Sequence, residues 1–302
     1  MTAAAAPAPA GWRAGLPFAI VTLIWGSTWL VIRDQLGTVS PSWSVTYRFA
    51  VAAAAMFALA TVRRERLWLA PRDQLFALGV GVTQFVLNYN LVYRAEAWIT
   101  SGVVALLYAL LIVPNALLGW LFVGQRVTRR FLAGSAIALA GVALLLAQEW
   151  AGGGAARGGV LAGIALALGG VLSASVSNVM QASDHGRALA MPVLLGWAML
   201  WGAVGDALVA LAVAGPPAFD PRPGYWAGVL YLGLAGSAVA FSLYFTVIRR
   251  IGAARAAYTS VLSPVIAMLL STLFEDYRWS AQAAAGCLLA SAGLLLALRA
   301  GR

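Results

Sequence analysis

Neutral polar and aromatic side chains interrupt several long apolar stretches at intervals that place them on one face of a helix. Gln84 and Asn88 are four residues apart, and so are Trp25 and Trp29. Side chains at this spacing lie one above the other on a helix. Amides and hydroxyls can hydrogen-bond a solute, while aromatic rings cover its apolar part. The pattern predicts a site for a zwitterionic solute that is held without being trapped by fixed charge.

Further residues of the same kinds occur at mid-depth of other apolar stretches, and we predict that they line one cavity together. Ser173 and Ser177 are also four residues apart. Pro114 and Pro264 each free backbone carbonyls one turn earlier, which a membrane tolerates only where protein or a wet cavity supplies partners. The predicted cavity set is Trp25, Ser27, Gln84, Asn88, Tyr108, Pro114, Ser173, Ser177, Ser237, Phe241, Tyr244, Ser260, Ser263 and Pro264.

Each of these residues also has a plainer explanation, which the sequence leaves open. Amides such as Gln84 can hydrogen-bond between helices as packing contacts. A proline can introduce a simple kink, and an aromatic stripe can face lipid or form an interfacial belt. The cavity is therefore a hypothesis that depends on how the helices pack.

The elements that must position these residues are apolar stretches of membrane-spanning length. Of the residues, 62% are hydrophobic, and the mean hydropathy is +0.86. A helix needs about 20 mostly apolar residues to cross the hydrocarbon core of a bilayer. We predict an all-α polytopic membrane protein with ten transmembrane helices and the lipid bilayer as its surroundings. The ten stretches are 14–32, 43–62, 74–93, 97–125, 131–148, 158–183, 188–214, 223–248, 256–274 and 279–298.

Arg48 and Asp206 are single charges within the second and seventh of these stretches. A charge inside a membrane span is costly and is a functional hypothesis by default. We interpret the two as a structural ion pair. Two alternatives stay open: a proton-carrying role for Asp206 and capture of a carboxylate by Arg48.

The composition argues against catalysis. The chain has one histidine, one cysteine and no lysine, since all 20 basic residues are arginine. A Walker A phosphate loop and a Schiff base both need a lysine, and a histidine metal cluster needs more than one histidine. Group transfer also requires paired acids or an activated nucleophile with its base. We expect no enzymatic activity, no cofactor and no bound metal.

The two halves of the chain share an ordered set of features. Segments 114–147 and 264–298 each begin at a proline, cross a short arginine-bearing turn and enter a helix with two glycines seven residues apart. We predict a disordered cytoplasmic tail at 1–12 and two five-helix repeats at 13–150 and 151–302. An odd number of spans in each repeat makes the two repeats inverted in the membrane, and inverted repeats place a solute site between them.

The arginines predict the orientation. Alternating the loops between two sides places fourteen arginines on one side and five on the other. Cytoplasmic loops carry the basic excess, so we expect both termini in the cytoplasm. This bias explains the net charge of +10 without any nucleic-acid partner.

Three motifs carry a family resemblance. Trp25-Gly26-Ser27, the Pro-x7-Phe-x-Gly turn that begins at Pro114, and the Gly-x6-Gly helix that follows resemble the drug/metabolite transporter superfamily, and within it the duplicated EamA-type exporters. The resemblance covers essentially the whole chain. One departure is Gly124-Gln125, where the family usually has Gly-Glu.

The resemblance implies a secondary transporter in a bacterial inner membrane that exports amino acids and related metabolites by alternating access. Aromatic amino acids are the first candidates; threonine, homoserine and methionine stay open. The alternatives are an efflux transporter for cationic drugs, whose small relatives use a glutamate in their first span that is missing here, and a structural or receptor protein. We expect facilitated diffusion rather than proton coupling, and a monomer or a homodimer.

Overall fold

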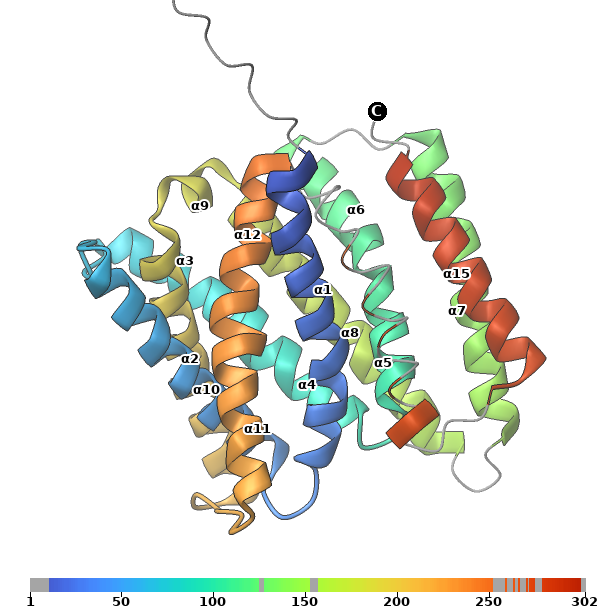
Figure 1. Cartoon of the computed structure of the whole chain (residues 1–302), viewed down its shortest axis with the longest axis horizontal. Coiled ribbons are helices and arrows are strands. Elements are labelled where there is room, and N and C mark those ends of the chain that lie inside the picture. The colour runs from blue at the N-terminus through green and yellow to red at the C-terminus, as the bar shows by residue number, and fades with distance from the viewer. Residues whose placement is uncertain are drawn as a thin grey trace, which may run out of the picture.

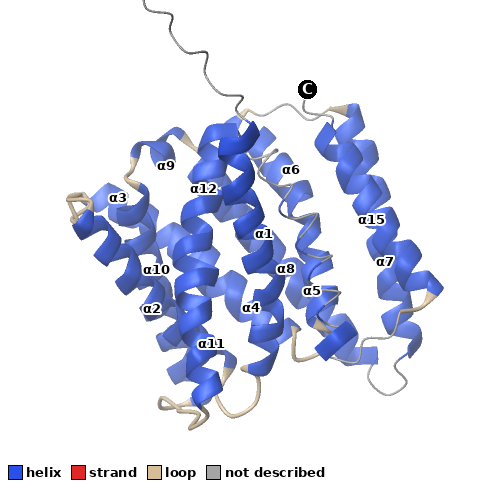
Figure 2. Ribbon diagram, in the orientation of Figure 1, coloured by secondary structure: helices blue, strands red, loops and turns tan. Residues whose placement is uncertain are grey.

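The structure is a computed structural model that describes residues 11–124, 128–152, 157–251, 259, 263, 266, 270, 272–274 and 279–299. Every regular element in these ranges is a helix, as predicted (Figure 2). Six helical segments in this part of the chain are long and apolar enough to cross a membrane: Pro41–Val62, Pro71–Ala95, Ser101–Val123, Gly158–Ala182, Met191–Ala214 and Pro223–Val247.

Some helices are uninterrupted and others change their winding within the span. The uninterrupted helices are α1 (Gly11–Asp34), α2 (Pro41–Val62), α7 (Arg129–Gly152), α8 (Arg157–Ala182), α9 (Asp184–Ala188), α10 (Met191–Ala214) and α15 (Ala281–Arg299). Two spans contain a π-helical turn: α3 (Pro71–Val80), η1 (Gly81–Leu87) and α4 (Asn88–Ala95); and α11 (Pro223–Gly233), η3 (Leu234–Val239) and α12 (Ala240–Ile251). One contains a 3₁₀ turn: α5 (Ser101–Tyr108), η2 (Ala109–Leu111) and α6 (Ile112–Val123).

Local sequence sets where several helices begin and end. Pro41, Pro71 and Pro223 occupy the first turns of α2, α3 and α11, where the missing N–H has no helical partner to lose. The side chain of Ser40 accepts a hydrogen bond from the backbone N of Trp43 and caps α2. The helix α6 ends at Gly124, whose φ of 71° is left-handed and suits a residue without a side chain.

The helices pack in pairs that bring distant parts of the sequence together (Figure 1). The helix α2 packs on α10, α1 on α12, and α4 on α8, while α7 and α15 form a separate pair at one edge of the bundle. This last pair is held by reciprocal glycine contacts. A Cβ on Gly141 would lie 2.3 Å from the backbone N of Ala290, and one on Gly293 would lie 2.3 Å from that of Ala138. The glycines that recur seven residues apart in the two halves therefore mark a contact within the chain.

Two aromatic groups mark the two ends of the α2–α10 pair. Tyr47 stacks on Trp43 and Phe219 near the start of α2, and Trp197 contacts Trp68 and Trp201 beyond its end. Tryptophan and tyrosine concentrate at the two membrane–water interfaces, so these groups indicate where the hydrocarbon layer stops.

The start of α1 and the end of α15 lie at the same end of the bundle (Figure 1). This agrees with the prediction that both termini face one side of the membrane. That this side is the cytoplasm stays a prediction based on the arginine distribution.

Candidate functional site

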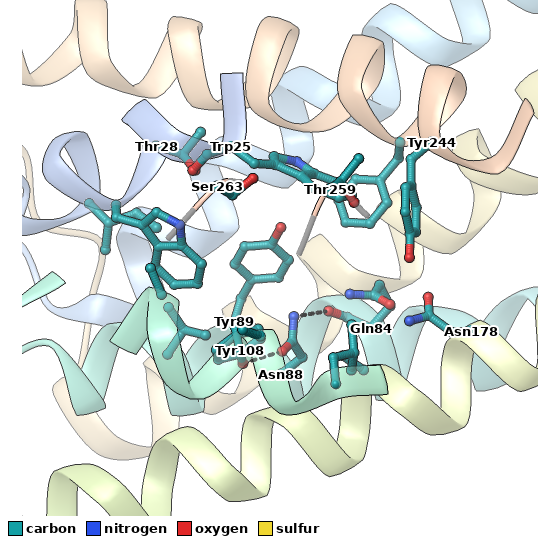
Figure 3. Close-up of a pocket in the computed structure, with 18 residues that line it drawn as sticks. Trp25, Thr28, Gln84, Asn88, Tyr89, Tyr108, Asn178, Tyr244, Thr259 and Ser263 are labelled. Carbon is teal, nitrogen blue, oxygen red and sulfur yellow. Dashed lines mark hydrogen bonds between the residues drawn. The ribbon is translucent and has the colours of Figure 1, made fainter. Parts of the chain in front are cut away.

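A cavity lies between the α1–α12 pair and the α4–α8 pair, closed on another side by α5 (Figure 3). The empty space between its walls, open solvent included, is about 760 Å³. None of its described lining side chains carries a charge. The lining residues are Trp25, Thr28, Trp29, Ile32, Gln84, Asn88, Tyr89, Val92, Ala105, Tyr108, Ala109, Leu111, Ala174, Asn178, Phe241, Tyr244, Thr259 and Ser263.

Aromatic rings form one wall of this cavity. The ring of Trp25 meets those of Tyr244 and Phe241 edge-on, at centroid distances of 4.8 and 5.4 Å. The indole Nε1 of Trp25 donates to the carbonyl oxygen of Gly236 at 3.2 Å, which fixes the ring between α1 and η3. Edge-to-face pairs of this kind are favourable beyond the area that they bury. This wall offers a rigid apolar surface to a solute.

Polar groups form the facing wall. The hydroxyl of Tyr108 donates to Oδ1 of Asn88 at 2.5 Å, and Nδ2 of Asn88 donates to the carbonyl oxygen of Gln84 at 3.2 Å. The side-chain Oε1 of Gln84 is buried and accepts no hydrogen bond from any described residue. Buried polar atoms are nearly always paired, so an unpaired acceptor on a cavity wall is positioned for a solute or a water molecule.

The π-helical turn η1 produces this wall. The backbone N–H of Asn88 bonds the carbonyl oxygen of Thr83, five residues earlier. One extra residue in the turn lets Gln84, Asn88 and Tyr89 all reach the cavity. Such turns are rare and often mark functional sites. Because η3 occurs at a similar depth in the α11–α12 segment, the same distortion appears in both halves of the chain.

The structure brings half of the predicted cavity residues to one place. Whether they bind a solute stays a prediction. Seven of them line the cavity: Trp25, Gln84, Asn88, Tyr108, Phe241, Tyr244 and Ser263.

Five predicted cavity residues lie off the wall, and two of them make hydrogen bonds elsewhere through their side chains. Ser27 bonds the hydroxyl of Tyr231 at 2.6 Å, between α1 and α11. Ser173 donates to the carbonyl oxygen of Thr83 at 2.7 Å, between α8 and η1. Each of these serines is therefore a packing contact rather than a cavity group.

The remaining three are also absent from the cavity wall. Ser237 bonds Arg48 and the carbonyl oxygen of Leu232. Ser177 is buried in α8 away from the cavity. Pro114 lies in α6 beyond the 3₁₀ turn η2, which is the distortion that a proline imposes on the preceding turn.

Two residues of the predicted cavity set cannot be placed, and several lining residues were not part of that set. Ser260 and Pro264 lie outside the described residues. Five polar or aromatic residues line the cavity without belonging to the predicted set, although the spacing of Trp29 from Trp25 was part of the pattern: Thr28, Trp29, Tyr89, Asn178 and Thr259. Their position one turn from, or next to, a predicted residue was the signal that could have found them.

Arg48 and Asp206 do not form the expected ion pair in the part of the chain that the structure describes. Arg48 donates from Nε to Oγ of Ser237 at 2.9 Å. Asp206 accepts from Nδ2 of Asn90 at 2.6 Å. Although α2 packs on α10, one side chain turns to η3 and the other to α4, so the two charges have different neighbours.

The sequence profile of the EamA-like transporter family matches the chain twice, over residues 13–147 and 161–299. The chain belongs to this family. It is a multi-pass membrane transporter with a helical fold. The two matches fall within the predicted halves 13–150 and 151–302, whose boundaries stay a prediction.

Several curated proteins resemble this transporter. An uncharacterised inner membrane transporter of Escherichia coli K12, YedA, is 30% identical over 83% of this chain and 79% of its own length. A probable terminal-alkyne amino-acid exporter of Streptantibioticus cattleyicolor is 28% identical over 92% of this chain and 90% of its own. The protein PagO of Salmonella typhimurium is 28% identical over 44% of this chain and only 43% of its own length.

A solved crystal structure has the same fold as this transporter. It aligns with a TM-score of 0.72 over 96% of this chain and 98% of its own, at 22% identity. The likeness shows a common arrangement of the helices.

Proposed function

We propose that this transporter exports amino acids, aromatic ones first, through the cavity between α1, α4, α5, α8 and α12. The observation that carries the proposal is the lining: an aromatic wall faces a wall of amides and hydroxyls, with no charged side chain among the described residues. The amino-acid exporter named among the relatives and the sequence resemblance to YddG-type aromatic amino acid exporters support the same substrate class.

The lining suits a solute with one apolar and one polar end. Trp25, Phe241 and Tyr244 can cover an aromatic or aliphatic side chain. Gln84 and Asn88 can bond an ammonium or carboxylate group across the cavity. A charge fixed on the wall would bind such a solute more tightly in the resting state and would slow its release.

The proposed mechanism needs ten helices in two inverted repeats that rock against each other around the cavity. Three observations support it. The family profile matches twice. The helix α1, in the first span of the first half, packs on α12, in the third span of the second half; α4, in the third span of the first half, packs on α8, the first span of the second half. The Gly141 and Gly293 contacts are reciprocal.

Facilitated diffusion is the simplest energetic scheme for this mechanism. The described residues that line the cavity include no acid or base that could exchange a proton with the solute. We expect flux to be unchanged when the proton gradient is collapsed. A steep dependence on the gradient that Asp206→Asn removes would contradict this scheme.

Flux of labelled phenylalanine into liposomes that contain the purified protein tests the proposal. We expect saturable uptake that unlabelled tryptophan inhibits, with threonine as a weaker competitor. Methyl viologen serves as the cationic competitor, and inhibition by it alone would favour the drug-efflux alternative. The absence of flux for every amino acid would overturn the substrate class but not the family.

Matched variants connect the flux to the cavity. Gln84→Ala removes the unpaired acceptor and is expected to lower phenylalanine flux. Gln74→Ala removes an amide from the same span that bonds the indole of Trp201 outside the cavity, and should leave flux unchanged. Equal flux in the two variants would place the solute path elsewhere.

A further inference from the structure

Arg48 is a buried cation without an anionic partner among the residues that the structure describes. Its side chain is 1% exposed, and it makes hydrogen bonds only to neutral groups. Nε donates to Oγ of Ser237 at 2.9 Å, and Nη2 lies 3.4 Å from the hydroxyl oxygen of Tyr89 and 3.5 Å from the carbonyl oxygen of Gly236. Nη1 has no hydrogen-bond partner in the described structure.

The surroundings of Arg48 compensate its charge only in part. The guanidinium carbon lies 4.4 Å from the ring centroid of Tyr89 and 5.5 Å from that of Phe49, and such cation–π contacts are favourable. A buried ion nevertheless loses its hydration, and this cost is offset only when an opposite charge in good geometry and further hydrogen bonds replace the lost water. Asp206 does not supply that charge, because its carboxylate bonds Asn90. The surroundings of Arg48 therefore favour the binding of an anion near its guanidinium group.

Tyr89 connects this cation to the cavity. It lines the cavity, and its hydroxyl oxygen accepts the hydrogen bond from Arg48. The described structure shows no acceptor for the proton of that hydroxyl. A hydroxyl that accepts from a guanidinium is a stronger donor, because chains of hydrogen bonds polarise one another. The indole of Trp25, on the aromatic wall, bonds the same Gly236 carbonyl as Arg48 does.

We propose that the cavity selects solutes that carry a carboxylate group, with Tyr89 donating the hydrogen bond and Arg48 acting behind it as the positioning residue that supplies the positive charge. The carboxylate lies at Tyr89, and the apolar part of the solute lies along Trp25 and Phe241. The inference rests on the proposed function only for the identity of the solute as an amino acid. It assigns the polar end of the cargo to one side of the cavity.

Four probes that share a phenyl ring test the proposal. Phenylalanine and 3-phenylpropionate carry a carboxylate, whereas phenylalaninamide and phenethylamine do not. Their affinities are measured by titration calorimetry on the purified full-length protein in lipid nanodiscs. We expect phenylalanine and 3-phenylpropionate to bind about ten-fold more tightly than phenylalaninamide and phenethylamine, because each carboxylate gains one hydrogen bond to a charged group.

Two tyrosine variants separate the assigned donor from the rest of the cavity. Tyr89→Phe keeps the ring and its contact with Arg48 but removes the donor, so phenylalanine should bind only as tightly as phenylalaninamide. Tyr244→Phe removes a hydroxyl from the aromatic wall and should change both affinities by the same factor. Arg48→Gln should also abolish the preference for phenylalanine over phenylalaninamide. If Arg48→Gln does not fold, the result for Tyr89→Phe decides between the outcomes.

The outcomes distinguish this proposal from the export of amino acids. Equal affinities for phenylalanine and phenylalaninamide in the wild-type protein, or a preference that survives in Tyr89→Phe, overturn the carboxylate site even if phenylalanine is transported. Tight binding of 3-phenylpropionate that depends on Tyr89, without flux of any amino acid, supports the carboxylate site and overturns the amino-acid substrate. Binding of none of the four probes overturns both.

Discussion

The hydroxyl of Tyr108 lies 2.5 Å from Oδ1 of Asn88 and donates a hydrogen bond to it. The bond joins the end of α5, where the 3₁₀ turn begins, to the start of α4, where the π turn ends. Two irregular turns thus meet at one contact on the cavity wall. Gly170 of α8 makes room for it, because a Cβ there would lie 2.2 Å from the hydroxyl oxygen of Tyr108.

Gly170→Ala should therefore displace the hydroxyl of Tyr108 from Asn88. Loss of one positioned hydrogen bond lowers the affinity for a solute by about ten-fold. The control is Gly169→Ala, whose added methyl would meet only a side-chain carbon of Leu91, at 3.4 Å. Transport kinetics in liposomes measure the difference. Equal KM values for the two variants would show that the Tyr108–Asn88 bond does not shape the site.

Gly141→Ala should destabilise the pair of α7 and α15. The added methyl would lie 2.3 Å from the backbone N of Ala290, and a backbone atom cannot move aside as a side chain can. Overpacking of this kind costs about 1–3 kcal/mol. Thermal unfolding in detergent should show a lower Tm than for Gly158→Ala, whose methyl meets nothing within 4 Å. An unchanged Tm would mean that the two helices separate at little cost.

The loop between α10 and α11 should become less stable in acid. Side-chain hydrogen bonds from Arg222, followed by one from its backbone N–H, lower the pKa of Asp220; the shortest of them are 2.8 and 2.9 Å long. A carboxyl with a lowered pKa stabilises the folded state above its unfolded pKa of about 3.9 and loses this contribution as the pH falls through the folded value.

The measurement is the difference in Tm between the wild-type protein and Asp220→Asn across pH. We expect a positive difference at pH 7 that closes as the pH falls below about 4. Arg222→Gln should reduce the same difference, because it removes the partner. A difference that persists unchanged in strong acid would show that Asp220 acts through packing rather than charge.

The predicted orientation can be tested with single cysteines in a Cys287→Ala background. Arg66 is exposed in the loop after α2, and Pro217 is exposed in the loop before α11. A membrane-impermeant maleimide added to intact cells should label Pro217→Cys and spare Arg66→Cys, because the arginine-rich side faces the cytoplasm. Labelling of Arg66→Cys alone would invert the topology.

Four-residue spacing predicted the cavity residues only in part, because Ser173 and Ser177 share that spacing within the uninterrupted helix α8 and yet lie off the wall. Gln84 and Asn88 could be placed on one face because they are four residues apart, and the structure puts both on the wall. Ser237 could not be placed, because the π turn η3 adds a residue to the helix and each residue rotates the following side chains by about 100°. No local pattern noted in the sequence predicts such a turn.

The sequence alone predicts a helical membrane protein in which two helices carry small residues suited to close packing. Both properties follow from local chemistry: apolar stretches of sufficient length enter lipid, and small residues allow two backbones to approach. Which polar residues share a cavity depends on how the helices pack and cannot be seen in the sequence. Arg48 and Asp206 have suitable charges on adjacent helices, yet one faces Ser237 and the other Asn90. The partner of a buried polar group depends on the rotation of each packed helix, and that rotation is set by the contacts of the whole bundle.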